Sequence, residues 1–232
     1  MKTAKTCILS LFVFVSQLVI HSPVTASEKT YIISYSSGTR FHELVRDRTK
    51  AVYDKAGIKA QFVVMPHKRS LSSANEGTSD GDVGRVPSVL ERYPNLRRVN
   101  VKLMDLNGAV YTVRHDITSY NDAILKQYKV GHINGVQWTE EKMKGLEATK
   151  VDNYTILFEM LLQGRIDIAL ATDISAEETL AGMGEKGSEI HKLNPFVFSK
   201  PIHHYVNKKN ESIIPQLERA ARALHEEGYW KE

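Results

Sequence analysis

The sequence predicts an α/β fold with two similar lobes, each a mainly parallel sheet flanked by helices. Apolar runs of strand length alternate with longer segments whose apolar residues recur at helical spacing. This order is typical of βα units that build parallel sheets. The same order starts again at Ser119, with no Pro- or Gly-rich linker before it. We therefore expect two lobes joined by short crossing segments.

The first half begins with a strand over residues 31–35 and a helix whose apolar face runs from Phe41 to Ala56. Gly57 can end this helix, because glycine readily adopts the left-handed conformation that closes many helices. The elements expected next are a strand over 60–65, a helix over 69–76 that Pro66 permits, a strand around Val83 and a strand over 96–101.

The second half repeats this pattern and ends in an amphipathic helix. The expected elements are helices over 119–126, 139–144, 153–163 and 212–228, and strands over 130–133 and 166–171. Extended segments at 109–114 and 201–206 are the candidate crossings between lobes. We therefore expect residues 27–111 and 202–232 to form lobe 1, and residues 112–201 to form lobe 2.

The first 26 residues have the pattern of a cleaved export signal. Lys2 and Lys5 form a basic start, residues 7–20 are almost wholly apolar, and small residues precede position 27. The apolar run is shorter than the roughly 20 residues that a membrane-spanning helix needs. The competing interpretation is a membrane anchor. We expect a mature periplasmic chain that begins at Ser27.

The composition excludes several classes of site. Cys7 is the single cysteine and lies in the signal, so the mature chain has no thiol for catalysis, zinc binding or disulfides. Removing 26 of the 232 residues leaves 206, enough to bury a core without covalent staples. The net charge of +4 falls to +2 without Lys2 and Lys5, and basic residues are mixed with acidic ones. Nucleic-acid binding therefore has no support.

Two segments share a local plan in which a helix ends at a glycine, a GxxD turn follows, and a strand ends in polar residues. In the first half the turn is 77–80 and the strand ends at Arg85. In the second half the turn is 164–167 and the strand leads to Thr172 and Asp173. Ligands of open α/β sheets bind at the carboxyl ends of strands. These strand ends are therefore the candidate binding site.

A zwitterionic ligand suits this pair of strand ends if the two lobes face each other. The guanidinium of Arg85 matches a carboxylate, and Asp173 matches an ammonium group. The structural alternatives are that Arg85 caps a helix or pairs with Glu91, and that Asp173 caps the helix starting near Ser175.

Four segments together resemble a known family, the bacterial extracellular solute-binding proteins of family 3, which are periplasmic receptors of polar amino acid ABC transporters. The matching segments are residues 66–99, 130–135, 164–173 and 199–202. The resemblance covers essentially the whole mature chain. It implies the two-lobed periplasmic binding protein type II fold, closure on a ligand, and no catalysis.

The resemblance also implies roles for individual residues. Asp173 matches the acidic residue that holds the ligand amine, and Asn134 and Gly135 match a turn whose amides bind a carboxylate. Tyr35 matches an aromatic residue that packs on the ligand. Arg69, in the matching segment, and Thr172 complete the candidate set.

Two departures from the family pattern affect the ligand assignment. The family has Ser or Thr after the turn glycine, where this chain has Val136. The family's arginine lies about twelve residues beyond the first GxxD aspartate, which corresponds to Arg92. We prefer Arg85, because it ends a predicted strand whereas Arg92 lies in a predicted helix.

The leading hypothesis is a monomeric binding protein for an amino acid or similar zwitterion, serving an ABC transporter. One alternative is an exported cyclohexadienyl dehydratase-like enzyme, for which Glu76, His67 and His132 are the candidate general acids. Another is a module that reports the ligand to a membrane sensor. Transport and sensing cannot be separated from the sequence, because either partner would contact exposed lobe surfaces.

We expect no cofactor and no metal. The GxGxxG spelling at 182–187 follows a predicted helix, whereas a dinucleotide site needs a strand before it. His203 and His204 are adjacent on a predicted strand and so point to opposite faces.

Overall fold

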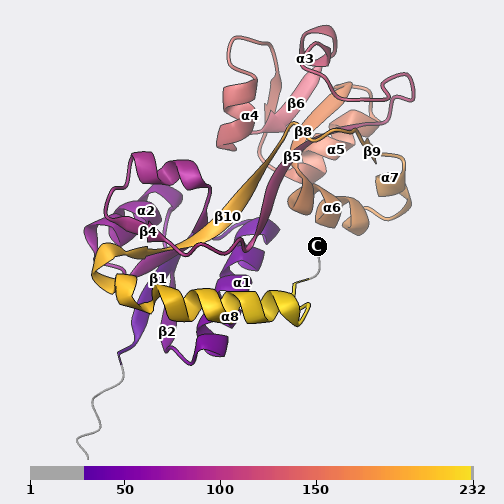
Figure 1. The fold of residues 1–232 in the computed structure, drawn as a ribbon. Coiled ribbons are helices and arrows are strands. Elements are labelled where there is room, and N and C mark those ends of the chain that lie inside the picture. Colours follow the sequence, from indigo (N-terminus) through magenta and orange to yellow (C-terminus); the bar gives the residue numbers. More distant parts are fainter. Residues whose placement is uncertain (1–28, 231–232) are drawn as a thin grey trace, which may run out of the picture.

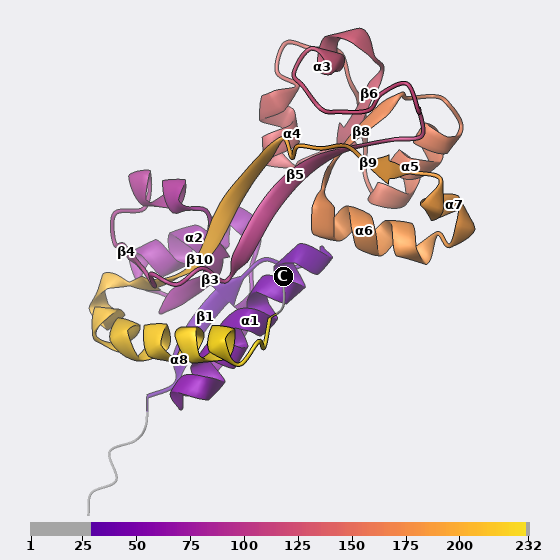
Figure 2. The same ribbon diagram turned by 45° about the vertical axis from the view of Figure 1, so that its right-hand side comes forward.

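The chain forms two groups of helices and strands connected by two long antiparallel strands (Figure 1). The computed structural model describes residues 29–230, so the expected signal over 1–26 lies outside the described residues. The connecting strands are β5 (Met104–Thr112) and β10 (Phe198–Asn207). Each begins in one lobe and ends in the other, and Figure 2 shows them side by side from a second direction.

Lobe 1 contains the first elements of the chain and its last helix. Its strands are β1 (Tyr31–Tyr35), β2 (Ala60–Val64), β3 (Gly81–Arg85) and β4 (Leu96–Arg98). Its helices are α1 (Arg40–Ala56), α2 (His67–Glu76), α8 (Ile214–Glu226) and the 3-10 turns η1 (Pro87–Glu91) and η2 (Lys208–Ile213).

Lobe 2 is built from the middle of the chain. Its strands are β6 (Val130–Ile133), β7 (Thr149–Val151), β8 (Ile168–Thr172) and β9 (His191–Lys192). Its helices are α3 (Ile124–Gln127), α4 (Gln137–Lys142), α5 (Tyr154–Leu162), α6 (Asp173–Gly182) and α7 (Glu185–Ser188).

One continuous sheet runs through both lobes in the order β2-β1-β3-β10-β5-β8-β6-β7. The parallel pairs lie within the lobes, where β1 pairs with β2 and β3, and β6 pairs with β7 and β8. The antiparallel pairs all involve β5 or β10. The predicted βα order thus accounts for the parallel strands, and the two connecting strands supply the antiparallel ones.

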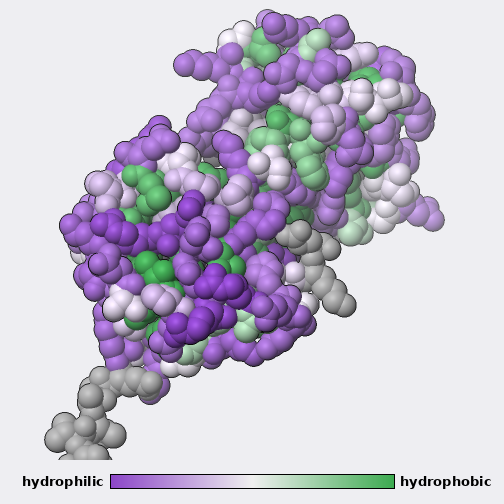
Figure 3. All heavy atoms as spheres, viewed as in Figure 1, coloured by the Kyte–Doolittle hydropathy of each residue, from purple (hydrophilic) through white to green (hydrophobic). Residues whose placement is uncertain are grey.

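Each lobe has its own apolar core. In lobe 1, Val45 and Val52 of α1 pack with Leu217 of α8 against the sheet. In lobe 2, buried residues cover both faces of the sheet, one cluster including Phe158 of α5 and the other Leu125 of α3. The view in Figure 3 shows a mostly hydrophilic surface with hydrophobic residues visible only in small areas. Each lobe thus buries its own apolar residues, and Ile174 of α6 in lobe 2 also packs against the lobe 1 core.

Local sequence explains why these elements begin and end where they do. Thr39 caps α1 by accepting a hydrogen bond from the His42 amide, and Gly57 closes the helix with a φ of 67°. Strands β1 and β6 have the bounds expected from the sequence. Gly108 lets the connecting strands approach closely, because a Cβ there would lie 2.5 Å from the Phe198 ring.

Three elements differ from the expectations. The helix expected over 119–126 is a loop followed by the single turn of α3, and the Tyr120 amide of the loop bonds the Asn194 carbonyl. The strand expected over 96–101 ends at Arg98. The last helix begins at Ile214, because residues 208–213 form a 3-10 turn that Asn207 caps. Within residues 29–230, no helix is long and apolar enough to cross a bilayer.

Candidate functional site

The two GxxD aspartates stabilise the sheet in the same way in both lobes. The Asp80 carboxylate accepts a hydrogen bond from the Ile32 amide of β1 at 2.9 Å. The Asp167 carboxylate accepts one from the Lys129 amide, directly before β6, also at 2.9 Å. Each aspartate thus fixes the start of the neighbouring parallel strand. The fold therefore explains the shared GxxD motif without a ligand. The contacts of the residues at the two strand ends decide whether those residues can bind one.

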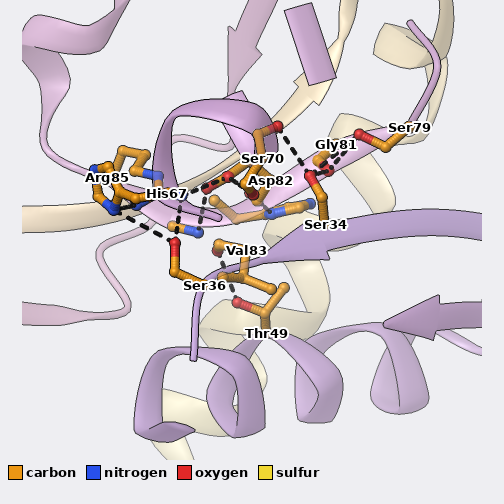
Figure 4. A network of polar contacts seen from close by, with 12 residues as sticks. Ser34, Ser36, Thr49, His67, Ser70, Ser79, Gly81, Asp82, Val83 and Arg85 are labelled. Carbon is orange, nitrogen blue, oxygen red and sulfur yellow. Dashed lines mark hydrogen bonds and ion pairs between the residues drawn. The ribbon is translucent and has the colours of Figure 1, made fainter. Parts of the chain in front are cut away.

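Arg85 lies at the end of β3 in a polar network inside lobe 1 (Figure 4). Its Nη2 forms an ion pair with the Asp82 carboxylate at 2.8 Å and donates to Ser36 Oγ at 3.3 Å. Asp82 is fully buried and also accepts a hydrogen bond from Ser70 Oγ at 2.5 Å. Arg85 is 7% exposed. Arg85 therefore pairs with Asp82. It neither caps a helix nor pairs with Glu91.

Two histidines face Arg85 from the helices next to it. Nη1 of Arg85 lies 2.9 Å from Nδ1 of His67, and the His67 and His42 ring centroids are 6.3 Å apart. Burial and the neighbouring Arg85 charge lower the pKa of His67 to about 4 and also lower that of His42. Nδ1 of neutral His67 can then accept the bond that Arg85 donates. Among the described residues, Arg85 Nε has no hydrogen-bond partner although it is buried.

Asp173 is the first residue of α6 and is 7% exposed. One carboxylate oxygen accepts a hydrogen bond from Nδ2 of Asn107 at 2.9 Å, and the other accepts one from the Ile174 amide at 2.7 Å. No cation within residues 29–230 forms an ion pair with it. Burial raises the pKa of Asp173. The end of β8 thus holds a buried carboxylate with hydrogen-bond donors but no positive partner.

Thr172 precedes Asp173 and belongs to the same strand end. Its Oγ1 accepts a hydrogen bond from the Trp138 indole at 3.1 Å. The Trp138 ring packs edge-on against Phe198 at a centroid distance of 5.0 Å. Thr172 therefore holds the Trp138 side chain of α4, and the Trp138 ring packs against Phe198 of the connecting strand β10.

The turn after β6 is exposed, and its amides already have partners. The Asn134 amide donates to the Val151 carbonyl at 2.8 Å. The Gly135 amide, at a φ of 78°, donates to the Glu140 carboxylate at 3.0 Å. The chain's own carboxylate thus occupies the amide expected to bind a ligand carboxylate, so a ligand would have to displace Glu140.

The remaining predicted residues, Tyr35 and Arg69, belong to lobe 1. Tyr35 ends β1, is 8% exposed and belongs to the lobe 1 core, with the Arg46 guanidinium 5.6 Å from its ring centroid. Arg69 is exposed on α2, and Arg92 is exposed directly after η1. Within residues 29–230, neither Tyr35 nor Arg69 forms a hydrogen bond with Asp173.

A cavity of about 230 Å³ lies between the two lobes. Its lining residues come from the start of α1 in lobe 1 and from α5 and α6 in lobe 2: Gly38, Thr39, Arg40, Asn153, Tyr154, Thr155, Ser175, Glu178 and Thr179. Figure 2 shows the first turn of α1 beside α6, and Arg40 Nε lies 3.9 Å from Glu178 Oε1 across this gap. None of the seven predicted residues lines the cavity, but Ser175 is two positions beyond Asp173.

The cavity-lining residues were missed because they follow the strand ends by a few positions. Residues 38–40 begin three positions after the end of β1, and residues 153–155 begin two positions after the end of β7. The rule that ligands bind at the carboxyl ends of parallel strands points to both segments. It is the signal that could have found them.

The candidate general acids lie away from this cavity. His132 is fully buried in β6, where burial lowers its pKa and Nδ1 lies 2.9 Å from Thr139 Oγ1. Glu76 is exposed at the end of α2. His203 and His204 are buried against backbone carbonyls. The part of the chain that the structure describes holds no group of three metal-ligating side chains.

Comparisons with known proteins identify the fold. No family model matches the chain, and no curated protein matches it. Among solved structures, it is similar to a histidine kinase sensor domain with similarity to periplasmic binding proteins: TM-score 0.63, 12% identity, 87% of this chain and 92% of that one. It is also similar to the substrate-binding protein of an amino acid ABC transporter: TM-score 0.60, 17% identity, 86% and 95%.

A further similar structure is the arginine-, lysine-, histidine-binding protein ArtJ from Geobacillus stearothermophilus, with a TM-score of 0.60 and 14% identity over 87% of this chain and 91% of that one. Identities this low show the fold alone. They confirm the predicted two-lobed α/β fold of the periplasmic binding protein kind, with a curled sheet flanked by helices.

Proposed function

We propose that the chain captures a small polar solute between its two lobes, closes around it and performs no chemistry on it. The solute carries an ammonium group and a carboxylate, as amino acids do. The observation that carries this proposal is Asp173, a buried carboxylate without a cation partner among the described residues. Asp173 is the first residue of α6, and Ser175 of the same helix lines a cavity to which both lobes contribute.

The energetics of Asp173 favour a positively charged ligand group. A buried charge is costly unless it is paired and hydrogen-bonded. The amides at the start of α6 and the Asn107 side chain compensate only in part, because they supply dipoles rather than a full charge. An ammonium group beside Asp173 would complete the pairing.

The ligand carboxylate has two candidate partners on opposite lobes. In lobe 1, Arg85 keeps a buried Nε without a partner among the described residues, although Asp82 already neutralises its charge. In lobe 2, the Gly135 amide can exchange Glu140 for a ligand carboxylate. A ligand that contacts both lobes favours the closed state by its differential affinity for that state.

The similar structures support a role in amino acid uptake. One is the substrate-binding protein of an amino acid ABC transporter, and ArtJ binds arginine, lysine and histidine. We accordingly assign this chain to the periplasm as a monomer after removal of residues 1–26, with the lobes divided at residues 111 and 201. Delivery of ligand to a membrane sensor is the second candidate, because a histidine kinase sensor domain shares the fold.

The enzyme alternative receives no support from the cavity. Glu76, His67 and His132 are absent from its lining. A general acid must lie within hydrogen-bonding reach of the group that it protonates. The predicted ligand-binding residues are absent from the lining as well, so the preference for a binding protein rests on the Asp173 carboxylate, which has no cation partner among the described residues.

Calorimetry tests the proposal directly. The chain from Ser27 onward is titrated with the twenty amino acids, and each that binds is titrated again with its 2-hydroxy acid analogue, which lacks the amine. We expect at least one amino acid to bind, and its analogue to bind more weakly. If no amino acid binds to protein that circular dichroism shows to be folded, the proposed function is wrong.

A further inference from the structure

Asn107 lies on the connecting strand β5, opposite Ser199 of β10. Its Nδ2 donates a hydrogen bond to Asp173 at 2.9 Å, so a residue of the connecting strands holds the carboxylate of the candidate site. Asn107 is a polar residue at the start of an otherwise apolar run toward Thr112.

The orientation of the Asn107 amide follows from its partner. An ionised carboxylate only accepts hydrogen bonds, so the NH₂ group must face Asp173, and the reverse orientation would set two acceptors against each other. The amide oxygen of Asn107, Oδ1, receives no hydrogen bond from the ionised carboxylate. It is buried and has no donor among residues 29–230. Buried polar atoms normally have a hydrogen-bond partner, and an unsatisfied one calls for an explanation.

The Asp173 carboxylate and Asn107 Oδ1 are both acceptors with an unmet need among the described residues: the carboxylate has no cation partner, and Oδ1 has no hydrogen-bond donor. The charged groups that act on Asp173 are Glu177, which repels a negative charge, and Lys192, whose ammonium instead forms an ion pair with Glu177 at 2.5 Å. Its remaining titratable neighbours are two tyrosines, Tyr111 and Tyr154. A single group with several N–H donors and a positive charge would satisfy both the carboxylate and the amide oxygen.

We propose that Asn107 Oδ1 and the Asp173 carboxylate together bind the primary ammonium group of the ligand. This inference rests on the proposed function and makes Asn107 a determinant of specificity for amines. A primary ammonium has three N–H donors, so it can reach both acceptors and still contact a third group. Because Asn107 belongs to β5, bound ligand would also contact a strand that joins the lobes.

Four variants separate this role from a structural one. Asn107→Leu removes both polar atoms at similar volume, Asp173→Asn removes the charge, and the double variant measures their coupling. The exposed Asn100→Leu is the matched control. Each protein is titrated by calorimetry with the amino acid that wild type binds most tightly and with its 2-hydroxy acid analogue. The Asp173 carboxyl is also titrated by ¹³C NMR without ligand.

If the inference holds, Asn107→Leu weakens amino acid binding by about tenfold or more, as expected for a lost hydrogen bond to a charged group. It leaves binding of the hydroxy acid almost unchanged, and the two substitutions are not additive. In the ligand-free protein the pKa of Asp173 rises in Asn107→Leu, because the Asn107 bond favours the ionised form. Asn100→Leu behaves as wild type in each measurement.

The results that would contradict the inference differ from those that would contradict the proposed function. If Asn107→Leu weakens amino acid and hydroxy acid equally, or weakens neither, Asn107 does not bind the amine and the inference is wrong while solute binding stands. If wild type binds the hydroxy acid as tightly as the amino acid, the ammonium site is wrong but capture of a solute is not. If wild type binds neither, the proposed function fails and the inference fails with it.

Discussion

His204 gives the structure a built-in sensitivity to acid that can be measured. The residue lies in β10 and is 1% exposed. Its Nδ1 donates to the Asp82 carbonyl at 2.9 Å, and its Nε2 accepts from the Tyr53 hydroxyl at 3.0 Å. Both ring nitrogens are used by the neutral form, and burial lowers the pKa of His204 to about 4. Protonation would place an unpaired charge in the lobe 1 core.

The sign and size of the effect follow from linkage between protonation and folding. The ordinary pKa of 6.5 applies to the unfolded chain, which therefore binds a proton between pH 6.5 and about 4 that the native state does not. The free energy of unfolding consequently falls as the pH falls through this window. The difference between the two pKa values corresponds to about 3 kcal/mol. His67 contributes in the same direction but less, because it is partly exposed.

Urea unfolding of wild type and His204→Gln across this pH window measures the contribution. Glutamine keeps one donor and one acceptor but does not titrate. We expect the variant to lose about 3 kcal/mol less stability than wild type between pH 6.5 and pH 4. The exposed His115→Gln should follow the wild-type curve. A variant of His204 with the same pH dependence as wild type would refute the reasoning.

Three further predictions concern the charged groups around the site. Asp173→Asn should weaken binding of the best amino acid ligand by at least about tenfold in calorimetry, because a hydrogen bond to a charged group is lost; unchanged affinity would contradict the site. Asp82→Asn should lower the free energy of unfolding by about 3 kcal/mol, because it leaves the Arg85 charge buried and unpaired; urea unfolding that matches wild type would show that the ion pair is dispensable. Glu140→Gln should raise affinity for the same ligand roughly threefold to tenfold, because the amide of Gly135 is held less tightly; a loss of affinity would show that Glu140 assists binding.

Local patterns in the sequence identified most of the regular elements. The apolar spacing and the glycine at 57 define α1, and an apolar run defines β6 with its observed bounds. The helix expected over 119–126 is mostly a loop, and the Tyr120 amide of this loop bonds the carbonyl of Asn194, a residue far away in the sequence. The long strands β5 and β10 were expected only as short crossings. Their full length depends on pairing with each other and with strands of both lobes, which local patterns do not show.

The candidate site also depends on contacts that local sequence patterns do not show. Asp82 and Arg85 are three apart on a strand, where alternation predicts opposite faces, yet they form an ion pair at the strand end. The sequence therefore presented Arg85 as a free cation. Asp173 was selected because it follows a strand end, but the residue of α6 nearest to it in sequence that lines the cavity is Ser175. No sequence pattern marks Asn107; its hydrogen bond to Asp173 and its own unpaired amide oxygen are features of the structure alone.

A structure of the chain with its best amino acid ligand tests the central claim most directly. We predict that the ligand lies between the lobes, with its ammonium nitrogen within about 3 Å of the Asp173 carboxylate. Contacts to residues of both lobes should accompany this bond. A ligand bound to one lobe only, or one whose amine lies away from Asp173, would contradict the account.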